Sequence, residues 1–189
     1  RYDEFSYGRF RELTIAVAKY LEDLGACGKG KMIGLISENR PEWPIIYFAI
    51  LRTGATVVPM DALLGEAEIM HIIKDAGVHV LFCSAAQYDK VSEVDHLLKD
   101  LKKLIVLDAI NVKNRRIATL DEVITAGRKI KKDKPAKVKK NDIAALIYTS
   151  GTTGSSKGVM LSHWNIASNV AGLRRMIYFD ENDVFLSVL

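Results

Sequence analysis

The sequence predicts an α/β fold in which a mostly parallel sheet is flanked by helices. Short apolar runs alternate along the chain with longer segments whose apolar residues recur at helical spacing. The turns between them are short, and such alternation is typical of parallel sheets with helical crossovers. An apolar fraction of 49% beside 26% charged residues also indicates a globular chain that can bury a core.

The first predicted helix lies within residues 4–24. Its apolar positions follow helical spacing from Phe10 onward. Ser6 is expected as the N-cap, because a serine hydroxyl can accept a free backbone N–H at a helix start. Gly25 and Gly28 are expected to end this helix.

Three strands and two helices are expected next. Residues 31–37 read as a buried strand that is apolar on both faces, as parallel strands tend to be. Pro41 suits the first turn of a helix that extends to about residue 53. This helix is apolar nearly all round, so it should pack inside or line an apolar cavity. A strand at 54–59, a helix at 66–76 and a strand at 78–83 follow.

The second half continues the alternation, although the pattern weakens over the polar residues 111–119. The further expected elements are a helix at 91–101, a strand at 104–107, a short helix at 120–126, a strand at 143–148, a short strand at 158–161, a helix from Ser162 or His163 through Ile177, and another strand at 184–189.

The net charge of +4 comes from one segment. Residues 128–140 hold eight Lys or Arg and one Asp, and without them the chain has 19 basic against 22 acidic residues. The run lacks the interleaved aromatic residues on which nucleic-acid bases stack. We therefore interpret it as a solvated connection, and no nucleic-acid partner is expected.

Cysteine and histidine usage does not indicate a metal site. Cys27 and Cys83 supply neither a disulfide framework nor a paired metal-ligand spacing, so we expect small buried residues of a cytoplasmic protein. His71, His79 and His96 are isolated in the sequence, and core, edge or surface positions are expected for them. No apolar stretch approaches the roughly 20 residues that span a bilayer.

The most informative stretch is 147–160, I-Y-T-S-G-T-T-G-S-S-K-G-V-M, which begins in the last two residues of the expected strand at 143–148. It combines three glycines and six hydroxyl residues with Lys157. Glycines let backbone N–H groups approach an anion, hydroxyls donate further hydrogen bonds or face a metal, and an ammonium suits phosphate. The stretch is therefore predicted to bind phosphate, at the carboxyl edge of the sheet where ligands of such folds sit.

A Walker A loop and a flexible linker are the alternatives for this stretch. A Walker A loop requires glycine before its lysine and a hydroxyl after it, whereas Ser156 precedes Lys157 and Gly158 follows it. A Gly/Ser/Thr linker is compatible with the composition. Ordinary linkers are not usually set between a buried strand and an apolar restart such as residues 159–161.

Y-T-S-G-T-T-G-S-S-K-G-V resembles the signature loop of the AMP-forming adenylate enzymes, which include acyl-CoA synthetases, luciferases and peptide-synthetase adenylation domains. The chain departs from the family pattern at Ser156, where the family usually carries proline. This change should leave the loop more flexible before Lys157, because proline would restrict the backbone there. The opening residues 3–13 are also similar to the family, and S-E-N-R-P-E-W resembles the form common in fatty acyl-CoA synthetases.

The resemblance implies a two-step ligase. ATP and a carboxylic acid, here a medium- to long-chain fatty acid, form an acyl-adenylate and pyrophosphate, and the thiol of coenzyme A then displaces AMP. The residues implied at the ATP triphosphate are Thr149, Ser150, Gly151, Thr152, Thr153, Gly154 and Lys157. Thr152 is also implied as a contact of Mg²⁺. A peripheral membrane contact and a homodimer are compatible with the resemblance.

The resemblance also implies a domain assignment. Residues 1–189 correspond to part of the large N-terminal AMP-binding domain, without the small C-terminal domain. Arg1 is not an initiator methionine and the chain stops inside an apolar run, so we expect an excerpt of a longer protein. The family's catalytic lysine is expected beyond Leu189. No catalytic residue is therefore assigned, and the excerpt alone is expected to be inactive.

Other readings stay open at this point. A fatty acyl-AMP ligase or an aryl or amino acid adenylating enzyme fits the same loop. A non-catalytic nucleotide- or phosphate-binding module is a hypothesis of another class, and a basic RNA- or membrane-surface protein acting through residues 128–140 is a third. Tyr148, His163 and Trp164, beside the loop, are expected to pack or cap.

Overall fold

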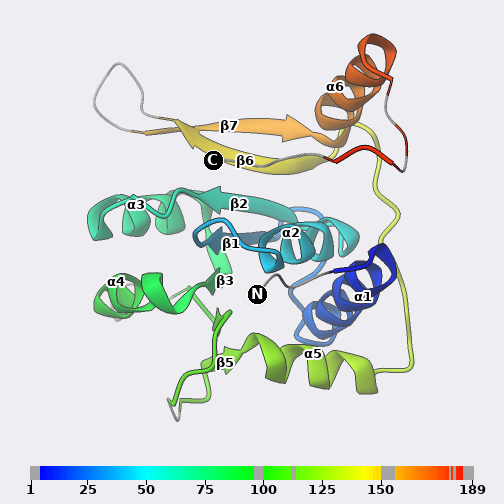
Figure 1. Cartoon of the computed structure of the whole chain (residues 1–189). Helices are drawn as coiled ribbons and strands as arrows, with labels where there is room; N and C mark the ends of the chain where they lie inside the picture. Colours follow the sequence, from blue (N-terminus) through cyan, green and yellow to red (C-terminus); the bar gives the residue numbers. More distant parts are fainter. Residues whose placement is uncertain are drawn as a thin grey trace.

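A seven-stranded sheet with helices on both faces forms the body of the protein (Figure 1). The computed structural model describes residues 5–95, 100–111, 114–149, 156–178, 180 and 182–184. The strand order is β5-β4-β3-β1-β2-β6-β7, and neighbours are parallel except for the antiparallel pair β6 and β7. The strands are β1 Met32–Ile36, β2 Thr56–Met60, β3 Val78–Cys83, β4 Lys103–Val106, β5 Ile117–Thr119, β6 Ile143–Thr149 and β7 Lys157–Ser162. The predicted fold class is confirmed.

Two layers of helices cover this sheet. The helices are α1 Tyr7–Asp23, α2 Glu42–Arg52, α3 Glu66–Ala76, α4 Ala85–Asp95, α5 Leu120–Lys129 and α6 His163–Met176. Helix α1 packs against both α2 and α5 on one face, while α3 and α4 pack together on the other (Figure 1). Helix α6 follows β7 and packs against that strand.

The central strand β1 shows how the apolar run fills both layers. Ile33 and Leu35 are fully buried in the cluster that α1, α2 and α5 share. Ile36 is fully buried in the cluster on the side of α3 and α4, because alternate side chains of a strand point to opposite faces. Cys83 lies in the same cluster, and burial raises the pKa of its thiol to about 12. Cys27 is half-buried, and both thiols are free.

The start of α1 agrees with the predicted cap. The Ser6 hydroxyl accepts the backbone N–H of Arg9 at 3.1 Å, and α1 begins at the next residue. Ser162 caps α6 in the same way, through the N–H of Asn165 at 3.2 Å. Both bonds satisfy N–H groups that the first helical turn leaves without an intrahelical acceptor.

Three expectations need correction. Helix α4 begins at Ala85 instead of residue 91, because the Ala85 N–H donates to the Asp108 carboxylate, a partner distant in sequence. Strand β5 was not predicted, since it is short and adds only to the edge of β4. Val184 is exposed and outside any strand, while residues 185–189 lie outside the described residues. Helix α2 agrees with its prediction, since Ile46 and Ile50 are fully buried while Phe48 and Leu51 line an apolar groove.

The basic connection between α5 and β6 is held to the helical layer by its backbone. The Ala136 N–H donates to the carbonyl of Arg52 at 3.0 Å, and the Lys19 ammonium donates to the carbonyl of Ile130 at 3.0 Å. Arg52 also pairs with Asp133 at 2.6 Å. The lysine side chains of this connection are exposed, as a solvated segment requires, but its path is set by α1 and α2.

The contact of α5 with α1 gives the first testable prediction. A Cβ added at Gly127 would lie 1.9 Å from the carbonyl oxygen of Ala16, a backbone atom that cannot move aside. We expect Gly127→Ala to lower the free energy of unfolding by roughly 1–3 kcal/mol or more, as overpacked cores do. Urea unfolding followed by circular dichroism measures this loss.

Gly172→Ala on α6 is the matched control, because nothing lies within 4 Å of the added Cβ. Alanine favours a helix interior by about 1 kcal/mol over glycine, so this variant should be neutral or slightly stabilised. Equal destabilisation of both variants would contradict the proposed close packing of α5 on α1.

Candidate functional site

The two ends of the predicted phosphate loop meet on the β6–β7 hairpin. Thr149 ends β6 and pairs directly with Lys157, which begins β7. Residues directly opposite in an antiparallel pair point to the same face, so both side chains project together. Both residues are exposed, and in the described part of the chain Lys157 has no ion-pair partner. The hairpin therefore offers an ammonium and a hydroxyl side by side.

Ser150, Gly151, Thr152, Thr153 and Gly154, which the sequence also predicts at the phosphates, lie outside the described residues. Their phosphate contacts, and the Mg²⁺ contact of Thr152, stay predictions. Among the residues that are described, no group of three or more His, Cys, Asp or Glu is arranged to hold a metal ion.

Helix α3 contacts the loop end of the β6–β7 hairpin, on the face opposite Thr149. The Tyr148 hydroxyl donates to the Asp75 carboxylate at 2.5 Å, and the His71 ring lies edge-on to Tyr148 with centroids 6.3 Å apart. His71 Nε2 also lies 3.4 Å from the carbonyl oxygen of Ser156. Partial burial and the neighbouring Asp75 raise the pKa of Tyr148. Tyr148 thus has the packing role that the sequence predicts, with a polar anchor on α3.

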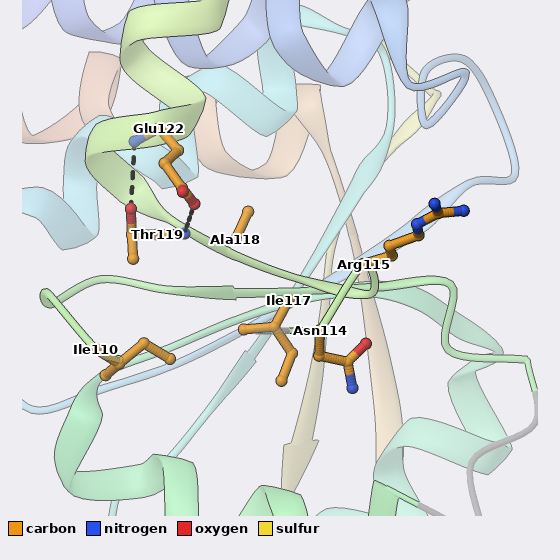
Figure 2. A pocket seen from close by; sticks show the side chains of 7 residues that line it. All are labelled: Ile110, Asn114, Arg115, Ile117, Ala118, Thr119 and Glu122. Carbon is orange, nitrogen blue, oxygen red and sulfur yellow. Dashed lines mark hydrogen bonds between the residues drawn. The ribbon is translucent and has the colours of Figure 1, made fainter. Parts of the chain in front are cut away.

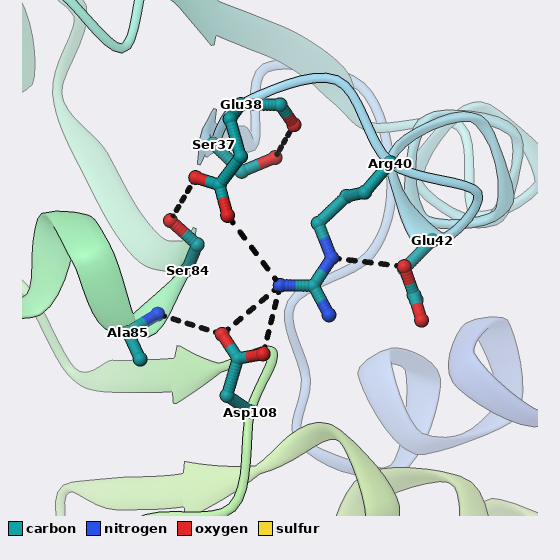
Figure 3. Close-up of polar contacts among 7 residues, drawn as sticks. All are labelled: Ser37, Glu38, Arg40, Glu42, Ser84, Ala85 and Asp108. Atoms are coloured by element: carbon teal, nitrogen blue, oxygen red, sulfur yellow. Dashed lines mark hydrogen bonds and ion pairs between the residues drawn. The ribbon is translucent and has the colours of Figure 1, made fainter.

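Thr149 lies at the carboxyl edge of the sheet, because it ends β6 and β6 is parallel to β2. The residues that follow β1, β3 and β4 lie along the same edge, and they form a polar network (Figure 3). Arg40 Nη1 binds both Asp108 carboxylate oxygens, at 2.9 and 3.0 Å, and Arg40 Nε binds Glu42 at 2.9 Å. The Ser84 hydroxyl donates to Glu38 at 2.6 Å.

This Arg40 network occupies the place where an open parallel sheet usually binds its ligand. The connections from β1 and β3 run in opposite directions, to β2 and to β4, and the crevice between such strands is the usual ligand site. Here Ser84 and Glu38 join the two strand ends directly, and Arg40 ties them to Asp108. Partial burial alone would raise the pKa of Asp108, but the Ala85 N–H and the Arg40 guanidinium together lower it.

Sequence reasoning missed Ser84 and Asp108 as members of this network. Each directly follows a predicted strand, Ser84 the strand at 78–83 and Asp108 the strand at 104–107. A polar residue at such a position was the available signal, because parallel strands end at one edge. Their common partner Arg40 could not be inferred, since it joins the network from a separate loop.

The other residues that the sequence analysis named contribute to local structure. The backbone N–H groups of His163 and Trp164 donate to the carbonyls of Asp142 and Lys140, at 3.1 and 2.8 Å. His79 is half-buried on β3, and burial lowers the pKa of its ring. His96 lies outside the described residues.

A pocket of about 440 Å³ lies beside β5 and the start of α5 (Figure 2), and it is an alternative candidate site. Its lining includes Thr119 and Glu122, which cap α5 reciprocally through each other's backbone N–H groups at 3.3 and 2.8 Å. The Asn114 side-chain oxygen likewise accepts the N–H of Arg116 at 2.9 Å. These polar groups stabilise local structure, so the hairpin is the better candidate site.

Comparison of the sequence with known proteins shows which family the chain belongs to. The AMP-binding enzyme family model matches residues 1–189. Fatty acyl-CoA synthetase B of Dictyostelium discoideum is 30% identical over 198 residues, a match of 100% of this chain and 29% of that protein. Long chain acyl-CoA synthetase 8 of Arabidopsis thaliana is 29% identical over 195 residues, a match of 97% of this chain and 27% of that protein.

Solved structures show the same fold. A long-chain-fatty-acid-CoA ligase (FadD1) from Archaeoglobus fulgidus superposes with a TM-score of 0.76 at 28% identity, over 92% of this chain and 34% of that one. A red-emitting luciferase from Phrixothrix hirtus superposes with a TM-score of 0.83 at 23% identity, over 95% of this chain and 34% of that one.

The chain therefore belongs to the AMP-binding enzyme family. It is similar to a long chain acyl-CoA synthetase of Arabidopsis thaliana and to a fatty acyl-CoA synthetase of Dictyostelium discoideum, and it spans less than a third of the length of either.

The Arg40 network gives the second prediction. Asp108→Asn should lower the free energy of unfolding by about 1–2 kcal/mol, because it weakens hydrogen bonds between charged groups. The pKa of Asp108 is lowered in the folded protein, so its stabilisation is present at neutral pH and is lost as pH falls below the ordinary carboxyl range. Urea midpoints measured from about pH 7 down to about pH 3 should therefore fall less for Asp108→Asn than for the unsubstituted protein.

Glu12→Gln is the control, because its pairs with Arg9 and Arg128 lie on the exposed surface of α1. Exposed pairs contribute little, so this variant should be much less destabilised at neutral pH. An Asp108→Asn variant as stable as the unsubstituted protein would refute a stabilising role of the network.

Proposed function

We propose that the protein activates a carboxylic acid with ATP, forming an acyl-adenylate and then an acyl-CoA thioester. The proposal rests on family membership and on one observation of the structure. The β6–β7 hairpin presents Thr149 and Lys157, which has no ion-pair partner among the described residues, at the two ends of a Gly/Ser/Thr sequence on the carboxyl edge of the sheet. Family membership supports ATP as the nucleotide, since the matching model is that of the AMP-binding enzymes.

Lys157 and the loop hydroxyls would act on the leaving group of the first step. A carboxylate oxygen attacks the α-phosphorus of ATP, and the bond from that phosphorus to the bridging oxygen of the β-phosphate breaks. Negative charge then builds up on the departing pyrophosphate. An ammonium and preorganised hydroxyl and N–H donors lower the energy of that charge. The pairing of Thr149 with Lys157 holds the loop ends for this task.

Mg²⁺ would be held by the nucleotide phosphates and Thr152, and it would neutralise part of the phosphate charge. In the second step the coenzyme A thiol attacks the acyl carbon, and AMP leaves as the thioester forms. We assign the role of the family's catalytic lysine to no residue of this chain. We place the reaction in the cytoplasm, where the free thiols of Cys27 and Cys83 stay reduced.

We infer a long-chain fatty acid as the substrate. This inference is supported by the acyl-CoA synthetases at 29% and 30% identity, whose matches cover nearly the whole chain. The S-E-N-R-P-E-W segment, common in fatty acyl-CoA synthetases, agrees with it, although the Arg40 network gives that segment a structural role.

The third prediction tests the loop. In the intact protein, Lys157→Gln should reduce kcat/KM for ATP by about 10²- to 10³-fold, because removing one preorganised donor at a developing charge has an effect of this size. ATP–pyrophosphate exchange with a saturating fatty acid measures it. Lys102→Gln, at an exposed lysine before β4, is the matched control and should leave the rate unchanged. Full activity of Lys157→Gln would refute the phosphate role.

The fourth prediction concerns the acid. Hydroxylamine added to the intact protein with ATP should trap the acyl-adenylate as a hydroxamate, with the highest rate for acids of long chain. Acids of graded length, an aryl acid and an amino acid are compared in the same assay. If the rate is highest with the aryl acid or the amino acid, the substrate is not a fatty acid. If no acid yields a hydroxamate, the protein is a non-catalytic nucleotide-binding protein.

A further inference from the structure

An apolar groove of about 450 Å³ lies between α1, α2 and the basic connection. We call it the α1–α2 groove. Its apolar lining comes from all three segments: Phe10 on α1, Phe48 and Leu51 on α2, and Pro135 and Val138 on the connection. Phe48 and Val138 are 51% and 43% exposed, so the groove opens to the surface. The proposed adenylation reaction uses none of these residues.

The groove has a defined shape, because its walls are fastened to one another. The rings of Phe10 and Phe48 meet edge to face with centroids 5.9 Å apart. The connection is tied to α2 by the Ala136 N–H, which donates to the Arg52 carbonyl, and by the Arg52–Asp133 pair at 2.6 Å. A surface segment with these contacts keeps its apolar residues beside those of the helices.

The rim of the groove is strongly basic. Lys134, Lys137 and Lys139 flank the lining residues in the connection, and all three side chains are exposed. In the part of the chain that the structure describes, none of the three forms an ion pair, whereas the nearby Asp133 is already paired with Arg52. The rim therefore carries exposed ammonium groups that form no ion pair among the described residues, while Glu22 interacts with Lys134, and Asp142 with Lys139, only at longer range.

An apolar groove with exposed cations fits an anionic lipid surface better than a nucleic acid. Residues 128–140 contain no aromatic side chain on which a base could stack, and the two aromatic rings of the groove, Phe10 and Phe48, pack edge to face on each other. Stable attachment to a membrane without a spanning helix needs two signals, apolar insertion and electrostatic attraction to anionic headgroups. The exposed Phe48 and Val138 supply the first, and the three rim lysines supply the second. No helix among the described residues is long and apolar enough to cross a membrane.

We propose that the α1–α2 groove and its lysine rim form the docking surface for a bilayer that contains anionic phospholipid. The lysine ammonium groups lie at the headgroups, and Phe48 and Val138 enter the boundary with the acyl chains. The connection leads into the first residue of β6, whereas Thr149 ends that strand, so docking leaves the phosphate loop at the other edge of the sheet accessible. The proposal does not rest on the proposed adenylation activity.

Co-sedimentation of the intact protein with lipid vesicles tests the proposal. Vesicles of phosphatidylcholine with about a third phosphatidylserine should bind the protein, and pure phosphatidylcholine vesicles should bind it much less. Substituting Lys134, Lys137 and Lys139 together by Gln should lower the partition coefficient about a hundredfold, because each lysine near an anionic surface contributes about a fivefold factor. High salt should release the unsubstituted protein.

A charge-matched control removes three positive charges elsewhere. Lys102→Gln, Arg174→Gln and Arg175→Gln together change the net charge equally, and all three side chains are exposed away from the groove. This variant should retain vesicle binding within about a factor of two to three, whereas uniform attraction by net charge would lower binding in both variants.

Two further variants test the apolar part. Phe48→Ser and Val138→Ser should each weaken binding to the anionic vesicles, and their urea midpoints show that they remain folded. The proposal is overturned by equal binding to both kinds of vesicle, by equal losses in the two triple variants, or by full binding of both serine variants. It is also overturned if a single-stranded RNA binds more tightly than the anionic vesicles at the same salt concentration.

Discussion

The parallel pairing of β6 with β2 is the contact that puts the candidate site in place. The buried Thr56 hydroxyl donates to the carbonyl of Ile143 at 3.0 Å, across a separation of 87 residues, and Val57 pairs with Ala145. This pairing brings the end of β6 to the edge where β1, β3 and β4 also end. The hairpin, α3 and the basic connection take their positions relative to one another from it.

The carboxyl edge carries charge in two different ways. At β1, β3 and β4, Arg40 is paired with the carboxylates of Glu38, Glu42 and Asp108, so its charge is used within the fold. At β6 and β7, Lys157 is exposed and has no described partner, so its charge is available to an anion. The same contrast holds between Arg52, which pairs with Asp133, and the rim lysines of the α1–α2 groove. Both proposed surfaces thus contain exposed lysines that form no ion pair within the described part of the chain.

Elements with a strong local pattern could be predicted closely from the sequence. Helix α3 and strand β3 have the predicted bounds, Ser6 is the predicted cap of α1, and α6 begins at His163, one of its two predicted starts, because periodicity and capping depend on neighbouring residues. The start of α4 and the short β5 were wrong or missed. Both depend on partners distant in sequence, the carboxylate of Asp108 for α4 and the edge of β4 for β5.

The sequence by itself determined the α/β class and the glycine, hydroxyl and lysine composition of the phosphate loop, because both follow from residue types at short spacing. Only the tertiary structure decided that Thr149 and Lys157 face the same way, and that Tyr148 is anchored to Asp75. It also decided that Arg40 closes the crevice between β1 and β3, and that the basic connection borders a groove with Phe48. These facts depend on strand register and on contacts between distant segments, which no local pattern encodes.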